Sequence, residues 1–451
     1  MKYTGYHHEK PRQDLQKKLS KHNTSLQKNN VWNTFANSDL TDVTGDDFSI
    51  IPRVLPLSYW PTIKRTSYLI TKFTMELLSL PEKEIRAIIP KGPNRDYLIN
   101  ELEVLRFRKG RITGSYRFDM AIVGAPVPGN LPKLLEINEI GFDGLARSTY
   151  FQNVLLELMP DVRKRLKSLD TAAAEIKNMQ RLGKALARFQ YDEYNWDEEF
   201  LIKTGKRLGS EIRLISPLQF GCDLEKNSPM LEQKKVSVKG GRVCIGNDWK
   251  PHAINMSYAY ELSDYIEGHS LYSKFVRSKT PQYGPFLTGL VAAKTILILL
   301  ADPLLQKKLL GKSNALGASV LPAHLLSDSK AEDSIRGYKE WVIKHTDGCG
   351  GELVFMNQEL LKRVRKTPAN QRHEWVLQQK TKLNLIDVNG ILSQPKKAIS
   401  DLGVFVQYDW DGKKFRHFEV GGLMTRATNK SLKVNVSGGG LQVAVLLDRA
   451  N

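Results

Sequence analysis

Two short segments carry residues whose spacing suits metal binding. Arg117 and Asp119 stand two positions apart in RFD, and Glu136 and Asn138 stand two apart in LLEIN. Side chains two positions apart on a β-strand point to the same face. If the two segments pair as strands, one face holds a cation, two carboxylates and an amide. Oxygen ligands of this kind suit Mg²⁺ rather than Zn²⁺; the alternative is two amphipathic strands with a solvated polar face.

A lysine followed by glycines indicates a second kind of site. Lys344 ends the predicted strand WVIK, shortly before Gly348, Gly350 and Gly351. Glycine-rich turns bring backbone N–H groups close to phosphate oxygens, and a lysine adds a positive charge. The P-loop pattern GxxxxGK[ST] is absent, because the lysine precedes the glycines. The alternative is an ordinary β-hairpin with a solvated lysine.

Lys294 stands inside the most apolar stretch of the chain. The segment Phe286–Leu305 is long enough to span a bilayer, but a lysine at its centre would be costly there. We predict a buried helix over Leu290–Ala301, whose lysine could reach a nucleotide phosphate. The alternative is a lysine that extends along the helix to solvent.

Two later segments could complete a nucleotide site. The predicted strand Trp375–Gln379 could bind an adenine through backbone hydrogen bonds, and Gln379 could point at the nucleotide. Arg426 follows GGLMT, where Gly421 and Gly422 would permit close backbone approach at a strand end. An arginine there could stabilise charge on a transferring phosphoryl group. The alternatives are a plain core strand and a surface arginine.

Composition sets the broad class. The 451 residues suit two or three domains, and a hydrophobic share of 41% argues against wholesale disorder. The net charge of +19 favours acidic partners such as nucleotides. Cys222, Cys244 and Cys349 form no CxxC motif, which argues against disulfides or structural zinc and indicates a cytoplasmic protein. No GxSxG, HExxH or helix-opening GxGxxG motif supports a hydrolase or dehydrogenase.

Hydrophobic periodicity and turn residues place these motifs on elements. Residues 1–30 read as a polar, basic arm. We predict a loop over Val54–Trp60, and helices over Tyr68–Leu80, Thr149–Leu169 and Ala172–Phe189. Strands are predicted at Glu211–Ser216, Val236–Gly246 (a hairpin), His252–Glu261, Trp341–Lys344, Trp375–Gln379, and Gly403–Asp409 paired with Lys414–Thr425.

Six motifs occur in an order that resembles one family. RFD, LLEIN, AAKTILILL, WVIKHTDGCGG, WVLQQ and VGGLMTR are similar, in this order, to the circularly permuted ATP-grasp ligases, which include the synthetase half of glutathionylspermidine synthetase. The resemblance covers roughly residues 110–440. It implies a mixed α+β and α/β fold, in which two lobes clasp ATP between antiparallel sheets beside a pre-ATP-grasp α/β unit. The domains implied are a basic flexible arm (1–30), an N-terminal part with the metal-ligand strands and a helical segment (31–190), the pre-ATP-grasp unit (191–285) and the ATP-grasp lobes (286–451).

The resemblance also implies an activity and residue roles. The activity is ATP-dependent ligation of a small-molecule or peptide carboxylate to an amine, through an acyl phosphate, with release of ADP and phosphate. Neither a membrane nor a nucleic acid is implied as partner. The implied roles are Mg²⁺ ligation by Asp119, Glu136 and Asn138, ATP binding by Lys294, Lys344, Gln379 and a lid containing Gly348, Gly350 and Gly351, and catalysis by Arg117 and Arg426.

Some features depart from the family and leave alternatives open. The loop after the Glu-x-Asn motif, Glu139–Gly144, is acidic and bulky where the glutathione-using member has small hydroxyl residues, which disfavours glutathione as substrate. One alternative is a basic nucleic-acid-binding protein, although no RNP, KH or helix-turn-helix signature is present. The other is a catalytically silent ATP-grasp scaffold.

Overall fold

The computed structural model describes most of the chain between residues 48 and 449. The described residues are 48–90, 95, 99, 111–139, 144–158, 163–189, 196–217, 231–255, 274–275, 277–285, 288–346, 353–388, 396–429, 434 and 440–449. The basic arm expected over residues 1–30 lies outside these ranges, as do Gly348, Gly350 and Gly351 and most of the loop after Asn138. These predictions therefore remain predictions.

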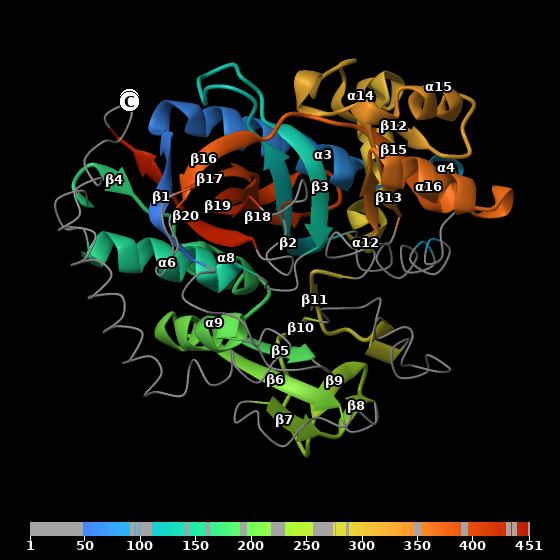
Figure 1. The fold of residues 1–451 in the computed structure, drawn as a ribbon. Helices are drawn as coiled ribbons and strands as arrows, with labels where there is room; N and C mark the ends of the chain where they lie inside the picture. The colour runs from blue at the N-terminus through green and yellow to red at the C-terminus, as the bar shows by residue number, and fades with distance from the viewer. Residues whose placement is uncertain are drawn as a thin grey trace.

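The described residues form a mixed α/β fold around a 14-stranded sheet (Figure 1). One half of this sheet is largely antiparallel, because β18, β19 and β20 follow one another through antiparallel pairs and β2 pairs antiparallel with β18. The strands of this half are β1 (Phe48–Pro56), β20 (Leu441–Asp448), β19 (Phe415–Thr428), β18 (Leu402–Trp410) and β2 (Ile112–Ala121), flanked by β3 (Lys133–Glu139), β4 (Leu166–Lys167), β16 (Asn384–Val388) and β17 (Lys396–Ser400). The predicted antiparallel pair near the C-terminus is confirmed as β18 and β19.

The other half of the sheet is parallel and continues from β2. Its strands are β11 (Gln282–Tyr283), β10 (Ala253–Asn255), β5 (Ala185–Phe189), β6 (Glu211–Pro217) and β7 (Leu231–Lys234). The predicted strand β6 and the hairpin of β8 (Val236–Lys239) and β9 (Arg242–Ile245) are confirmed. Gly240 and Gly241 form the hairpin turn with φ of +57° and +78°, a conformation that glycine adopts without steric cost.

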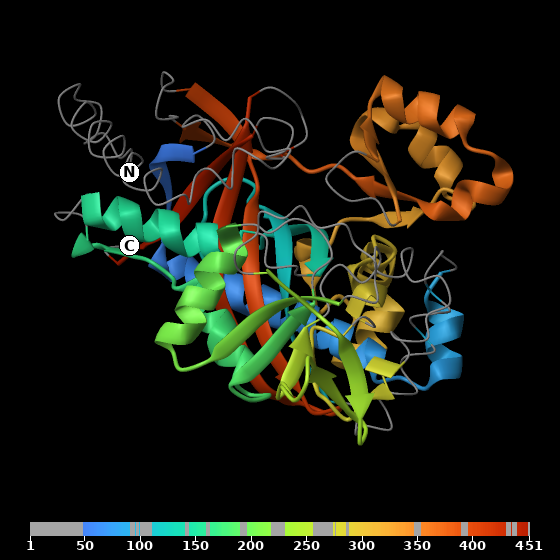
Figure 2. The same ribbon diagram turned by 90° about the horizontal axis from the view of Figure 1, so that it is seen from below.

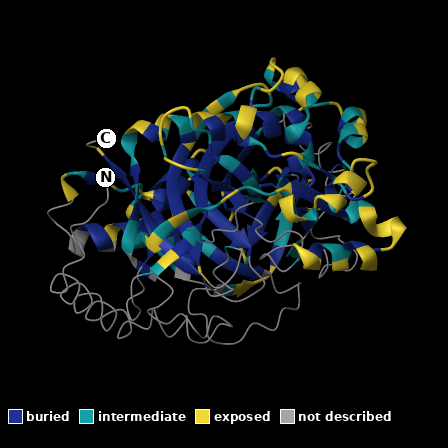
Figure 3. Cartoon of the chain, turned by 45° about the horizontal axis from the view of Figure 1, so that its top comes forward, coloured by how far each residue is buried: buried dark blue, intermediate teal, exposed yellow. Residues whose placement is uncertain are grey.

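Helices cover both faces of the antiparallel half. Helix α3 (Trp60–Leu78) packs on the face that carries Tyr116 and Phe118, in one continuous hydrophobic core. Helices α6 (Leu145–Leu158) and α8 (Thr171–Met179) cover the opposite face, and α9 (Trp196–Arg207) packs on β6. Figure 3 shows the strands buried in the centre and the exposed residues concentrated on the outer helices. Two short helical segments, η2 (Leu57–Tyr59) and α4 (Glu82–Ile88), precede and follow α3 in the chain.

A small four-stranded sheet lies beside the large one. Its order is β12 (Ala323–Leu325), β15 (Trp375–Gln379), β13 (Trp341–His345) and β14 (Val354–Met356), so the predicted strands at Trp341 and Trp375 are confirmed. Figures 1 and 2 show this sheet, with its helices, beside the β3 side of the large sheet. The helical segments here are α12 (Gly289–Ala292), α13 (Ile296–Ala301), α14 (Pro303–Leu310), η5 (Gly317–Ser319), α15 (Ala331–Arg336), η6 (Tyr338–Glu340), α16 (Gln358–Lys366) and η7 (Ala369–Glu374).

Several predictions of local structure are wrong in part or in full. The predicted helix Thr149–Leu169 extends too far, because α6 ends at Leu158 and Leu166–Lys167 form the strand β4. The segment Val54–Trp60 is not a loop: β1 runs to Pro56, and α3 begins at Trp60. Its prolines mislead because Pro56 ends an edge strand and Pro61 stands in the first turn of a helix, two places where the missing N–H costs little. The predicted helix Ala172–Phe189 is instead α8 followed by the strand β5. The prediction failed because ALARF is a buried strand and lacks the polar–apolar alternation that identifies a half-buried one.

No helix among the described ranges combines the length and the apolar character that crossing a bilayer requires.

Candidate active site

Strands β2 and β3 pair antiparallel and bring the predicted residues together. Arg117 lies opposite Asn138, and Asp119 lies opposite Glu136. Directly opposed residues share a face of the sheet, so the four side chains lie on one face, as the spacing predicted. This is the face that α6 and α8 cover further along the sheet.

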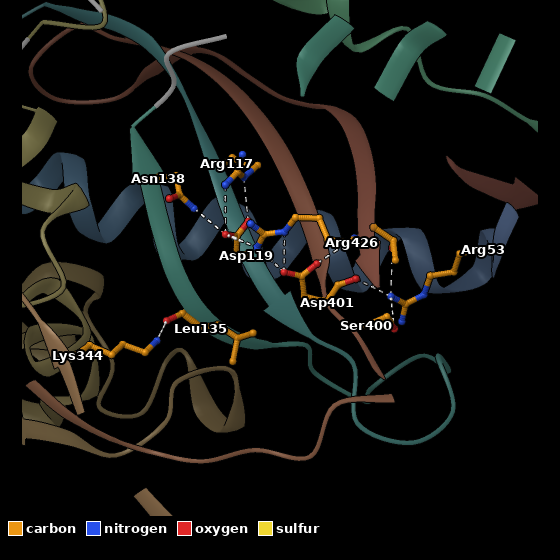
Figure 4. Close-up of polar contacts among 10 residues, drawn as sticks. Arg53, Arg117, Asp119, Leu135, Asn138, Lys344, Ser400, Asp401 and Arg426 are labelled. Atoms are coloured by element: carbon orange, nitrogen blue, oxygen red, sulfur yellow. Dashed lines mark hydrogen bonds and ion pairs between the residues drawn. The ribbon is translucent and has the colours of Figure 1, made fainter. Parts of the chain in front are cut away.

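Asp119 is the centre of the polar contacts on this face (Figure 4). Its Oδ1 accepts a hydrogen bond from Arg117 Nε at 2.9 Å. Its Oδ2 accepts from Asn138 Nδ2 at 2.8 Å and from Arg426 Nη2 at 2.8 Å. The structure therefore brings Arg117, Asp119, Asn138 and Arg426 into direct contact, with Arg426 arriving from β19.

Asp401, which the sequence did not single out, holds Arg426 from the other side. Arg426 Nε donates to Asp401 Oδ2 at 3.0 Å, and Arg426 Nη2 also contacts this oxygen. The backbone N–H of Arg426 donates to Asp401 Oδ1 at 3.1 Å. The carbonyl of Asp401 in turn accepts from the buried Arg53 Nη1 of β1 at 2.9 Å. A lone aspartate just before a strand matches no motif, so no sequence signal identified it.

The charges of this cluster shift its pKa values strongly. Burial favours the neutral acid, but the charges of Arg117 and Arg426 outweigh it and lower the pKa of Asp119 to about 2. Burial, opposed by Arg426 and assisted by Asp119, raises the pKa of Asp401. The two carboxylates raise the pKa of Arg426 against the effect of its burial. Asp119 and Arg426 are therefore both charged at neutral pH.

Lys344 approaches the same strand pair from the small sheet. It lies in β13, and its Nζ donates to the carbonyl of Leu135 in β3 at 2.9 Å (Figure 4). Its side chain is almost fully buried, and this burial lowers the pKa of Lys344 to about 8. The amine of Lys344 therefore lies against β3, next to the position of Glu136, and not in bulk solvent.

Lys294 also reaches β3, although its local structure differs from the prediction. The predicted helix Leu290–Ala301 is broken at this residue: α12 ends at Ala292 and α13 begins at Ile296. The backbone N–H of Lys294 donates to Thr346 at 3.0 Å, and its Nζ lies 3.4 Å from Glu136 Oε1. The break turns the lysine inward, where it is buried beside a carboxylate and does not extend to solvent.

Gln379 and Gln378 point to opposite sides of β15. Gln378 is buried and donates from Nε2 to the carbonyl of Leu134 at 3.3 Å, next to the Lys344 contact. Gln379 is exposed, and its backbone N–H donates to Pro322 at 2.8 Å. An adenine contact of Gln379 would thus use its side chain rather than its N–H group, and stays a prediction.

The glycines before Arg426 serve packing and not ligand approach. Gly421 and Gly422 lie inside β19 and not at its end. A Cβ on Gly422 would lie 1.8 Å from Thr171 Oγ1, and a Cβ on Gly421 would lie 2.4 Å from Ala174 Cβ. The missing side chains let β19 press against α8, which fixes the strand that carries Arg426.

The donor set fits Mg²⁺ in its chemistry. Asp119 is ionised, and the side chains of Glu136 and Asn138 carry further oxygen atoms on the same face. The described part of the chain holds no group of three or more His, Cys, Asp or Glu side chains that could bind a metal ion. A set with two carboxylates suits a cation that completes its shell with water and substrate phosphates, as Mg²⁺ does.

Comparison with known proteins shows a shared fold. No family model matches the chain, and no curated protein matches it in sequence. A glutathione synthetase-like effector from Globodera pallida, solved in its apo form, aligns with a TM-score of 0.63 over 89% of this chain and 90% of that one, at 12% identity. A gamma-glutamylcysteine synthetase candidate from Methylobacillus flagellatus is much less similar, with a TM-score of 0.39 and 14% identity over 82% of this chain and 84% of that one. The chain therefore shares the fold of the Globodera pallida effector.

Proposed function

We propose that this chain is an ATP-dependent carboxylate–amine ligase of the circularly permuted ATP-grasp type, with ATP and Mg²⁺ bound at β2 and β3. One observation carries the proposal. Two lysines from outside the β2–β3 pair contact β3, the strand that carries Glu136. Lys294, between α12 and α13, lies beside Glu136, and Lys344 of β13 donates to the carbonyl of Leu135. In the chain the carboxylates precede the lysines, which is the order of the permuted form.

The charge balance of the site supports an anionic ligand. Its cations exceed its carboxylates by two among the described residues, and the magnesium complex of ATP carries net negative charge. The cations are Arg53, Arg117, Lys294, Lys344 and Arg426, and the carboxylates are Asp119, Glu136 and Asp401. Cations gathered in a buried site attract an anionic ligand, so a bound polyphosphate would suit the site.

Each group then has a role in positioning and charge stabilisation. Lys294 and Lys344 would bind the ATP phosphates, and Asp119, Glu136 and Asn138 would hold Mg²⁺. When bound, Mg²⁺ would neutralise phosphate charge and orient the γ-phosphoryl group. Arg117 and Arg426 would stabilise the charge that develops on this group during transfer.

The reaction needs no nucleophile from the protein. A carboxylate oxygen of the acid bonds to the γ-phosphorus while the bond to the ADP oxygen breaks, which gives an acyl phosphate and ADP. The amine nitrogen then bonds to the acyl carbon, phosphate leaves, and the amine proton passes to phosphate or water. We propose a small molecule or a peptide as the acid and a primary amine as its partner.

A catalytically silent nucleotide-binding scaffold is the second candidate. It is favoured by the contacts of Asp119, whose oxygens already accept from Arg117, Asn138 and Arg426. In that case the chain binds ATP without transferring its phosphoryl group. A nucleic-acid-binding role has no comparable support from the described residues.

Hydroxamate formation separates these candidates. A panel of carboxylic acids and peptides is incubated with the protein, ATP, Mg²⁺ and hydroxylamine as surrogate amine, and ADP release is followed in parallel. The ligase gives ATP-dependent hydroxamate with at least one acid, in step with ADP. Nucleotide binding without hydroxamate or ADP across the panel would favour the scaffold, and an absence of nucleotide binding would refute both.

A further inference from the structure

Asp401 and Arg426 form a tightly connected pair. The carboxylate of Asp401 contacts Nε and Nη2 of the guanidinium and accepts the backbone N–H of Arg426, while the backbone N–H of Asp401 donates to the carbonyl of Arg426 at 3.1 Å. Both side chains are largely buried. Two guanidinium nitrogens contact the same oxygen, Asp401 Oδ2, and the other oxygen accepts the backbone N–H of the same arginine, so the contacts fix the orientation of the guanidinium as well as its place.

The backbone of Asp401 is also held in place, by an arginine of β1. Arg53, almost fully buried in β1, donates from Nη1 to the carbonyl of Asp401 at 2.9 Å and to Thr425 Oγ1 at 3.2 Å. Figure 4 shows the resulting row from Arg53 through Asp401 and Arg426 to Asp119. A change in the contacts of Asp119 therefore leaves the other end of this row anchored.

Asp119 alone is a poor anchor for Arg426. An ionised carboxylate offers about four lone-pair positions. Three are used by donors within 2.9 Å, from Arg117, Asn138 and Arg426. A cation bound to Asp119 would compete with the guanidinium of Arg426 for this oxygen set. Asp401 is not one of the predicted Mg²⁺ ligands. Its hydrogen bonds to Arg426 use its own oxygens, so they do not depend on the contacts of Asp119.

We infer that Asp401 is a positioning residue that keeps Arg426 directed at the transferring phosphoryl group while Asp119 holds the metal. This inference rests on the proposed function and adds a residue to it. Asp401 acts through Arg426 and touches neither nucleotide nor metal. It explains why the site contains a second buried carboxylate that the metal set does not need.

The test uses ADP, Mg²⁺ and aluminium fluoride, which together mimic the phosphoryl group in flight. Calorimetry on the full chain gives the affinity for ADP with Mg²⁺, with and without aluminium fluoride. In Asp401→Asn we expect the gain in affinity from aluminium fluoride to fall about tenfold or more, since a misplaced donor to the developing charge loses its effect. Affinity for ADP with Mg²⁺ alone should stay within about twofold.

Asp409→Asn is the matched control. Asp409 is equally buried at the other end of β18 and forms its own two-point pair with Arg111, with both distances at 2.9 Å. Its loss should lower stability comparably and leave the aluminium fluoride gain unchanged. Asp401→Glu keeps the charge but displaces it, so its increase in affinity with aluminium fluoride should be intermediate. If Asp401→Asn does not fold, Asp401→Glu is used in its place.

A second readout needs neither metal nor nucleotide. In the ligand-free protein, modification of arginines by phenylglyoxal is mapped by peptide mass spectrometry. Asp401→Asn should speed modification of Arg426 and not of Arg111, and Asp409→Asn should do the reverse. A full aluminium fluoride gain in Asp401→Asn, or in Asp401→Glu when the asparagine variant does not fold, overturns the inference, as does unchanged reactivity of Arg426. Wild-type protein that does not bind ADP with Mg²⁺ instead overturns the proposed function.

Discussion

Asp119 and Arg426 are separated by 307 positions in the chain and meet through a hydrogen bond of 2.8 Å. The contact exists because β18 pairs with β2 on one side and with β19 on the other, so side chains of β2 and β19 can meet across β18, where Gly403 lies opposite Asp119. The hydrogen bond joins Asp119, a predicted Mg²⁺ ligand, to Arg426, the predicted catalytic arginine of the C-terminal part.

Arg426→Ala should slow catalysis without weakening nucleotide binding. If its charge is needed most when the phosphoryl group is in flight, kcat falls by roughly 10²–10³ while ATP affinity changes little. Steady-state kinetics with an acid found in the hydroxamate panel, together with calorimetry, measures both. Arg165→Ala removes a comparable arginine–aspartate pair at Asp448, far from the site, and should leave kcat unchanged. Lost ATP affinity with preserved kcat would make Arg426 a nucleotide anchor.

Lys344→Met should change the pH dependence of two quantities that vary in opposite directions: the free energy of unfolding and the affinity for ATP. The pKa of Lys344 is lowered to about 8 in the folded protein, against about 10.4 in the unfolded chain. Between these values the unfolded chain binds more protons, so the free energy of unfolding of the nucleotide-free protein gains a contribution that rises with pH. ATP affinity instead falls above pH 8, because the neutral amine no longer attracts phosphate.

These profiles are measured by denaturant unfolding and by calorimetry at pH 7 and pH 9. Lys344→Met should remove both trends and weaken ATP binding at pH 7 by about 1–3 kcal/mol. Lys380→Met is the control, since Lys380 donates hydrogen bonds to the carbonyl of Lys339 in η6 and to Asn357 Oδ1 just before α16, and not to β3. Profiles that coincide in wild type and Lys344→Met would exclude the phosphate role.

Glu136→Gln should separate metal from phosphate. The change removes a predicted Mg²⁺ ligand and also the carboxylate 3.4 Å from Lys294. We expect affinity for ADP with Mg²⁺ to fall about tenfold, which is about 1.4 kcal/mol, while affinity for ADP in EDTA stays constant or rises. Glu419→Gln, a carboxylate on β19 beside His417, serves as control and should change neither value. Equal losses with and without metal would argue against the ligand role.

Gly422→Ala should destabilise the protein through packing. The added Cβ would lie 1.8 Å from Thr171 Oγ1, so β19 and α8 would have to move apart. Overpacking of this kind costs about 1–3 kcal/mol or more, measured by urea unfolding. Gly337→Ala has an ordinary φ of −89° and meets no atom closer than 3.6 Å, so its effect should be small. Equal stabilities of the two variants would contradict the close contact.

The sequence predicts the parts of the site that follow local rules. The pairing of β2 with β3 follows from period-two polarity and a Gly/Pro-rich turn, and it brings Arg117, Asp119 and Asn138 together. Lys344 is singled out because it ends a predicted strand and precedes glycines. These signals lie within a few residues of each other and do not require knowledge of the tertiary fold.

The remaining features depend on contacts between distant segments. Asp401 becomes significant only because β18 pairs with β19 and places it beside Arg426. The break at Lys294 is invisible in an uninterrupted apolar run, since the backbone partner that stabilises it is Thr346 in another element. The strand β5 reads as helix because burial in a parallel sheet removes the alternation that identifies a strand.

The central claim is that Lys294 and Lys344 bind the phosphates of ATP over the β2–β3 face. The most direct measurement is calorimetric titration with a non-hydrolysable ATP analogue and Mg²⁺, on wild type and on Lys294→Met/Lys344→Met. Wild type should bind in the micromolar to millimolar range that is usual for substrates, and the double variant should lose about a hundredfold or more, because two charged phosphate contacts are removed. Both proteins should have the same secondary structure by circular dichroism. A folded double variant with wild-type affinity, or a wild type that does not bind the analogue, would contradict the account.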